Sequence, residues 1–155
     1  MLPDGLPSMI QIRRIVCPTD FSPTADRAVA YAAELARSFG AELTLLHVIP
    51  EMTYPLRSFG MATAFPHLRE ELHKRADDEL QQVKQKLGAE PKANTLLRDG
   101  DAHTQVLECA KEIGADLIVI GTHGHTGIKH ALLGSTAEKV VRLSSCPVLT
   151  VRTHD

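Results

Sequence analysis

The chain has 155 residues, of which 43% are hydrophobic and 23% are charged, a composition typical of a globular protein with enough residues for its own core. Its formal net charge is only −2, which excludes a global basic field that would attract nucleic acid or an anionic membrane. Tryptophan is absent and aromatic residues make up 4%, so we expect an aliphatic core and no aromatic platform for single-stranded nucleic acid.

The cysteines and the apolar segments bear on the compartment. The sequence contains no apolar run near the roughly 18 residues that span a membrane, and no segment like the apolar core of a signal peptide. Cys17, Cys109 and Cys146 form no CxxC pair, and such a scattered set favours a reducing compartment. We therefore expect a cytoplasmic protein with no membrane partner. Cys17 is either a small buried hydrophobic residue, the interpretation we favour, or a redox group.

The first half of the chain predicts two strands and two helices. Residues 1–11 are short, mixed and rich in turn formers, and they are expected to form a flexible tail. Ser22 as N-cap and Pro23 at the first helical position predict a helix that Gly40 ends. The expected elements are a strand at 12–18, this helix, a strand at 42–49, a long connection at 52–66 and a charged amphipathic helix at 67–87.

The second half continues the alternation of strands and helices. Asp101 predicts a helix N-cap and Gly114 predicts the end of the same helix. The expected elements are a strand at 93–98, a helix at 101–113, a strand at 116–120, a helix at 135–143 and a strand at 148–152. Strict alternation predicts an α/β fold with a parallel sheet between two layers of helices. We find no linker or repeat, so one domain is expected over residues 12–152.

The most informative segment joins the strand at 116–120 to the helix at 135–143. It reads GTHGHTGIKHALLGS over residues 121–135, and Ser135 with Glu138 forms a capping box that predicts a helix start. Glycines let the backbone approach an anion, and the free N–H groups of a helix N-terminus favour negative charge. The segment therefore predicts a phosphorylated ligand, with a nucleotide as the natural candidate. It matches neither G-x-x-x-x-G-K-(S/T) nor G-x-G-x-x-G.

The glycine spacing resembles that of a known family. Gly121, Gly124, Gly134 and Ser135 form the pattern G-x2-G-x9-G-(S/T), which is similar to the ATP-binding branch of the universal stress protein family. Three further blocks extend the resemblance over roughly residues 12–152: RIVCPTDFS at 14–22, LLHVI at 45–49 and CPVLTV at 146–151. The resemblance implies an open, doubly wound, Rossmann-like sheet of five parallel strands in the order 3-2-1-4-5, with helices on both faces.

This strand order would place two sequence signals at one crevice. The order reverses between strands one and four, and open α/β sheets bind ligands outside the carboxyl ends of the strands at such a reversal. Asp20 follows strand one and Gly121 follows strand four. Asp20 either accepts hydrogen bonds from ribose hydroxyls or helps to hold a divalent cation, or it is only a turn or cap residue.

The other candidate residues carry similar alternatives. The three motif glycines either contact phosphate or only shape turns and caps, while Ser135 and Thr136 offer hydroxyl and backbone donors to phosphate. Ser135 could instead only cap its helix. By resemblance the nucleotide site also includes residues from the strand ends and the last helix, with the main chain of Val48 holding adenine: Pro18, Thr19, Val48, Ile120 and Ala137.

The histidines of the glycine loop invite a metal interpretation that we do not favour. His123, His125 and His130 could contact an anion or a transition metal, but no acidic or thiol ligand lies beside them at a tight spacing. His47, in an apolar strand, is most simply a hydrogen-bonded core histidine.

The sequence favours a binding protein over an efficient enzyme, since no combination of nucleophile, base and orienting group stands out. The resemblance implies a stress-response or signalling protein that binds ATP, ADP or AMP with Mg²⁺ or Mn²⁺. Two alternatives stay open: a slow ATPase, autophosphorylating or nucleotidyl-transfer enzyme on the same fold, and a ligand-free dimeric interaction module. The uncharged run in strand 148–152 predicts a homodimer through that sheet edge, as the resemblance also implies.

Overall fold

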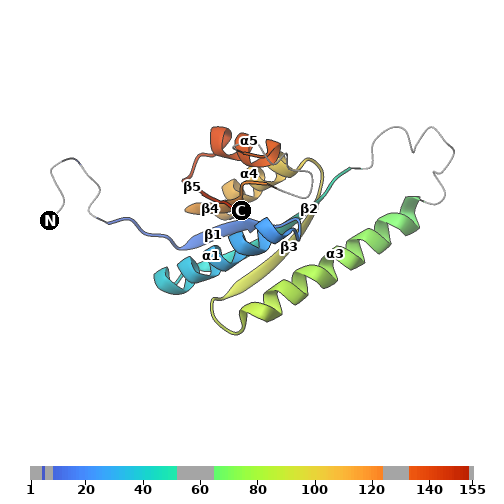
Figure 1. Cartoon of the computed structure of the whole chain (residues 1–155), viewed down its shortest axis with the longest axis horizontal. Coiled ribbons are helices and arrows are strands. Elements are labelled where there is room, and N and C mark those ends of the chain that lie inside the picture. The colour runs from blue at the N-terminus through green and yellow to red at the C-terminus, as the bar shows by residue number, and fades with distance from the viewer. Residues whose placement is uncertain (1–4, 6–8, 52–64, 124–132, 154–155) are drawn as a thin grey trace.

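The computed structural model describes residues 5, 9–51, 65–123 and 133–153. Their five strands form one parallel sheet in the order β3-β2-β1-β4-β5, so the predicted α/β class and strand order are confirmed (Figure 1). The sheet order reverses between β1 and β4, as expected. The strands are β1 (Arg14–Pro18), β2 (Glu42–Ile49), β3 (Ala93–Asp99), β4 (Leu117–Gly121) and β5 (Val148–Val151).

Helices cover both faces of the sheet, because successive strand residues point to opposite sides and both sides are apolar. Ile15 and Cys17 of β1 belong to one core cluster, while Val16 between them belongs to the other. The first cluster lies under α1 (Pro23–Phe39) and α3 (Phe65–Leu87), and the second lies under α4 (Ala102–Ile113) and α5 (Ser135–Leu143) (Figure 1).

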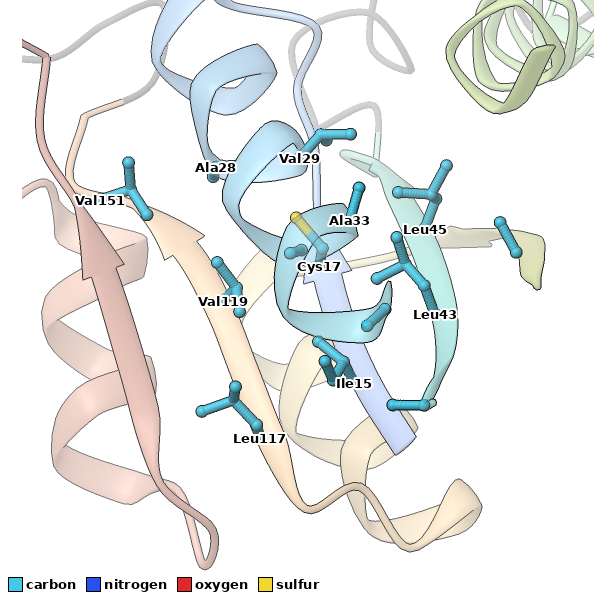
Figure 2. Packing of buried hydrophobic residues seen from close by; sticks show 14 of the residues in the cluster. Ile15, Cys17, Ala28, Val29, Ala33, Leu43, Leu45, Leu117, Val119 and Val151 are labelled. Carbon is cyan, nitrogen blue, oxygen red and sulfur yellow. The ribbon is translucent and has the colours of Figure 1, made fainter. Parts of the chain in front are cut away.

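The core under α1 is packed through alanines. Ala28, Ala32, Ala33 and Ala36 lie on the sheet-facing side of the helix and are almost completely buried. Figure 2 shows Cys17 among the apolar side chains of α1 and the strands. Burial raises the pKa of the Cys17 thiol to about 12, so it remains protonated near neutral pH. This surrounding supports the structural interpretation of Cys17 over the redox one.

The predicted caps of α1 and α4 are confirmed. The Ser22 hydroxyl accepts from Ala25 N at 3.2 Å, and Asp101 Oδ2 accepts from Thr104 N at 3.1 Å. Gly40 and Gly114 end these helices in the left-handed region, with φ of 65° and 64°. Their positive φ explains why glycine stands at both positions.

Two strands begin later than predicted. β1 begins at Arg14 rather than residue 12, and β4 begins at Leu117 rather than residue 116. The Asp116 carboxylate accepts hydrogen bonds from the backbone N–H groups of Arg13 and Arg14, at 2.8 and 3.0 Å. A side chain therefore satisfies two backbone donors at the start of β1.

Other element boundaries also differ from the prediction. Helix α3 begins at Phe65 rather than residue 67, because Pro66 lies in its first turn, where a missing N–H costs no hydrogen bond. β3 extends to Asp99 and β5 stops at Val151, one residue short of the predicted Arg152. The predicted tail lies mostly outside the described residues, as does nearly all of the 52–66 connection. No helix in the described ranges has both the length and the apolar character needed to cross a bilayer.

Candidate functional site

A cavity of about 490 Å³ opens at the carboxyl ends of β1 and β4, where the strand order reverses. Open α/β sheets hold ligands at this place. All but one of the site residues expected from sequence line its wall: Pro18, Thr19, Asp20, Val48, Ile120, Gly121, Gly134, Ser135, Thr136 and Ala137. The exception is Gly124, which lies outside the described residues, as do His125 and His130.

The turn that carries Asp20 is held by its own side chains. Asp20 Oδ1 accepts from Ser22 N at 3.0 Å, and Thr19 Oγ1 accepts from Phe21 N at 3.0 Å. Thr19 N donates to the carbonyl of Leu46 on β2 at 2.8 Å. Asp20 therefore has the turn role that the sequence left open, and it also lies on the cavity wall. A contact between Asp20 and a ligand stays a prediction.

Gly121 meets a steric requirement at the end of β4. A Cβ at this position would lie 2.9 Å from Thr24 Cγ2 and 3.2 Å from the Thr24 carbonyl oxygen. Thr24 is buried in the first turn of α1. Glycine at 121 thus lets β4 pass close to the start of α1, and this contact brings two walls of the cavity together.

The predicted capping box at the start of α5 is wrong. Gly134 is the N-cap, and Ser135 is the first helical residue with an exposed side chain. Gly134 N donates to the Thr122 carbonyl at 2.5 Å, so Gly134 rather than Ser135 is the N-cap, while the helix spans the predicted residues 135–143. Glu138 consequently pairs with Arg142 at 3.0 Å instead of reaching back to the cap.

This helix start leaves donors on the cavity wall. Glycine has no side chain with which to cap the first N–H groups of α5, and Gly134, Ser135, Thr136 and Ala137 all line the cavity. Such groups carry a partial positive charge and bind anions. Gly134 has an ordinary φ of −67°, so conformational freedom does not explain the glycine here. A Cβ would instead lie 3.0 Å from the Thr122 carbonyl oxygen, which shows that space is the constraint.

The charged side chains of the wall are few. Among the described lining residues, Asp20 is the carboxylate, His47 and His123 are the imidazoles, and there is no lysine or arginine. In the described part of the chain, no group of three or more His, Cys, Asp or Glu side chains could hold a metal ion without a ligand's help.

Sequence reasoning missed part of the wall. Ala102 and Val106 come from the start of α4, where the sequence carries no ligand-binding motif. Thr122 lies buried between Gly121 and His123. Thr122 Oγ1 lies 2.9 Å from His123 Nδ1. His47, interpreted as a core histidine, does form a hydrogen bond, yet it is only half-buried and also lines the cavity. The remaining unpredicted lining residues are Ala25, Leu46, Pro50 and Leu133.

Sequence comparisons identify related proteins along almost the whole chain. The model of the universal stress protein family matches residues 11–152. A universal stress protein of Methanocaldococcus jannaschii is 34% identical over 142 residues, covering 90% of this chain and 82% of the relative. A universal stress protein of Bacillus subtilis is 35% identical over 139 residues, covering 86% of this chain and 94% of the relative.

Structural comparisons agree with the sequence matches. UspA from Lactobacillus plantarum superposes with a TM-score of 0.82 at 26% identity, covering 92% of this chain and 99% of that one. A universal stress protein solved in complex with cAMP has a TM-score of 0.61 at 30% identity, with 93% and 99% covered. The protein from Archaeoglobus fulgidus solved in complex with dAMP has a TM-score of 0.61 at 26% identity, with 92% and 99% covered.

Proposed function

The chain belongs to the universal stress protein family, and from this premise we propose that it binds an adenine nucleotide in the cavity between β1 and β4. The observation that carries the proposal is the pairing of two features across one cavity: the amide donors at the start of α5 and the carboxylate of Asp20. Relatives solved with cAMP and dAMP, which both contain adenine and phosphate, support it.

The cavity wall suggests how a nucleotide would lie. Phosphate groups suit the N-terminus of α5, where Ser135 and Thr136 add hydroxyls to the backbone amides. The base suits the apolar part of the wall, formed by Leu46, Val48 and Val106. In this pose Asp20 would contact the ribose or a cation, and the main chain of Val48 would contact the adenine.

A divalent cation fits this arrangement. Mg²⁺ in nucleotide sites is commonly held by one or two carboxylates together with phosphate oxygens and water, and Asp20 offers one carboxylate beside the phosphate-binding end. The described part of the wall contains no lysine or arginine. We therefore propose that ATP binds with Mg²⁺ or Mn²⁺, which would offset phosphate charge, and that the bound nucleotide acts as a signal or structural ligand in the stress response.

We expect purified protein to bind ATP in the presence of Mg²⁺ or Mn²⁺. Titration calorimetry should show heat of binding, and ATP at 100 times its Kd should add about 2.7 kcal/mol to the free energy of unfolding. The matched control is inorganic phosphate, which lacks the base and should bind more weakly. No heat and no thermal shift at millimolar ATP would refute the proposal. Hydrolysis assays with and without Mg²⁺ would distinguish this binding protein from a slow ATPase.

We also propose a homodimer through β5, the last strand in the sheet order. Leu149 of β5 is 37% exposed, and Leu143 at the end of α5 is 54% exposed. An apolar sheet edge with open backbone groups is a template for pairing with a second copy, and a two-fold axis would bury the same patch on both.

Replacing Leu149 with lysine should weaken this dimer, because it places two like charges near the two-fold axis. Phe39→Lys is the control, since Phe39 is also exposed but lies at the end of α1. Val151 is unsuitable for the test, because it is buried and its carbonyl accepts from Thr122 N. Light scattering at tens of micromolar should give a dimer mass for wild type and Phe39→Lys only. A monomeric wild type would contradict the proposal.

A further inference from the structure

His47 lies on β2 with its ring against the turn that carries Asp20. Its Nδ1 atom is 2.7 Å from the carbonyl oxygen of Thr19. A carbonyl oxygen only accepts hydrogen bonds, so His47 Nδ1 must carry the proton and donate it. The Thr19 carbonyl belongs to the peptide group that continues into Asp20. The hydrogen bond therefore fixes the orientation of the peptide plane on the N-terminal side of Asp20.

The same ring supports the other side of Asp20. Phe21 adopts a left-handed backbone with φ of 63°, the only described non-glycine residue to do so. This conformation is costly for a bulky residue and persists only where its surroundings fix it. The Phe21 ring packs against the His47 ring with centroids 4.5 Å apart and planes at 33°. His47 thus contacts both neighbours of Asp20, one through a hydrogen bond and one through its ring face.

We propose that His47 is a positioning residue, which directs the Asp20 carboxylate into the nucleotide cavity by holding Thr19 and Phe21. The inference rests on the proposed function, since it assigns His47 a role in that same site. Asp20 Oδ1 already accepts from Ser22 N, so the direction of its carboxylate depends on the turn geometry. His47 contributes to the affinity for the nucleotide by holding the turn geometry rather than by filling space.

Two substitutions separate the hydrogen bond from packing. His47→Phe keeps a ring beside Phe21 but removes the N–H donor. His47→Asn keeps an amide donor near the Nδ1 position but removes the ring. A positioning role predicts about a tenfold loss of affinity for Mg²⁺·ATP in His47→Phe and about threefold or less in His47→Asn. A packing role predicts the reverse, because the asparagine variant loses more buried volume.

A double-mutant cycle tests whether His47 acts through Asp20. In an Asp20→Ala background, His47→Phe should cost almost nothing further, since the group that it positions is gone. His73→Phe is the control for losing a half-buried histidine, because His73 pairs with Asp99 on the α3 side of β3 and does not line the cavity. Its affinity should equal that of wild type.

The outcomes distinguish this inference from the proposed function. If wild type binds no ATP, the proposed function fails and the positioning role fails with it. If wild type binds but His47→Phe binds equally well, or if its effect adds fully to that of Asp20→Ala, only the positioning role is overturned. Long-range ¹⁵N–¹H spectra of ligand-free protein should show a proton on His47 Nδ1. A ring protonated only at Nε2 would refute the hydrogen bond independently of any ligand.

Discussion

Gly134→Val should reduce affinity for Mg²⁺·ATP by about 100-fold or more, or about 2.7 kcal/mol. A Cβ at 134 would lie 3.0 Å from the Thr122 carbonyl oxygen, the same atom that accepts the Gly134 N–H. The contacted atom belongs to the backbone, so rotating a side chain cannot relieve the contact. The Thr122 carbonyl or the start of α5 must give by a few tenths of an ångström, and the branched valine side chain needs further room where the α5 amides line the cavity. Because phosphate would depend on several of these amides together, the loss should exceed that of one hydrogen bond.

The matched variant for this experiment is Ser135→Ala. It leaves the backbone amides in place and removes one exposed hydroxyl, so it should lower affinity by no more than about tenfold. Calorimetry gives the affinities, and circular dichroism with thermal unfolding establishes that the valine variant is folded. A folded Gly134→Val protein with wild-type affinity would show that the start of α5 does not contact phosphate.

Asp20→Ala should weaken nucleotide binding by roughly 1–3 kcal/mol, the usual cost of losing a charged hydrogen-bond partner. The alanine variant alone is ambiguous, because it also removes the acceptor for Ser22 N. Asp20→Asn resolves this, since its amide oxygen can still accept from Ser22 N while the charge is lost. We expect Asp20→Asn to unfold close to the wild-type temperature and yet to bind Mg²⁺·ATP weakly.

The opposite pattern would assign Asp20 to the turn alone. In that case Asp20→Ala loses stability but keeps its affinity for ATP, normalised to folded protein, and Asp20→Asn resembles wild type in both measurements. Repeating the titrations without Mg²⁺ separates a ribose contact from a cation contact. If Asp20 holds the cation, omitting the metal should shrink the difference between wild type and Asp20→Asn.

The features that sequence predicted well depend on local chemistry. The caps at Ser22 and Asp101 and the left-handed glycines at 40 and 114 act within one helical turn, so their residue types were sufficient. The alternation of strands and helices can also be seen in the local sequence pattern, and it predicted the parallel sheet. The family resemblance supplied the order of the strands. The sequence predicted that Asp20 and Gly121 share one cavity because both lie at the carboxyl ends of strands that meet at the reversal.

The features that sequence missed depend on contacts between distant segments. The N-cap of α5 is Gly134, whose N–H donates to the Thr122 carbonyl, a contact that no capping rule contains. Two backbone N–H groups at the start of β1 donate to the Asp116 carboxylate, about 100 residues away along the chain. The contact between His47 and Phe21 requires the pairing of β1 with β2 to be known first. Each of these three features depends on tertiary contacts, which a reading of local sequence does not contain.

The alanine face of α1 has a consequence for how this protein tolerates change. The methyl groups of Ala28 and Ala32 set the distance between α1 and the sheet. The close-packed interior has no room for a longer side chain at these positions. The same helix carries Thr24 against Gly121 and Ala25 on the cavity wall. A valine at position 28 would therefore push α1 away from the sheet. Because α1 also carries Ala25 on the cavity wall, the shape of the cavity would change even in a variant that still folds. Substitutions on the buried face of α1, which contact no ligand, would then change the affinity for a ligand.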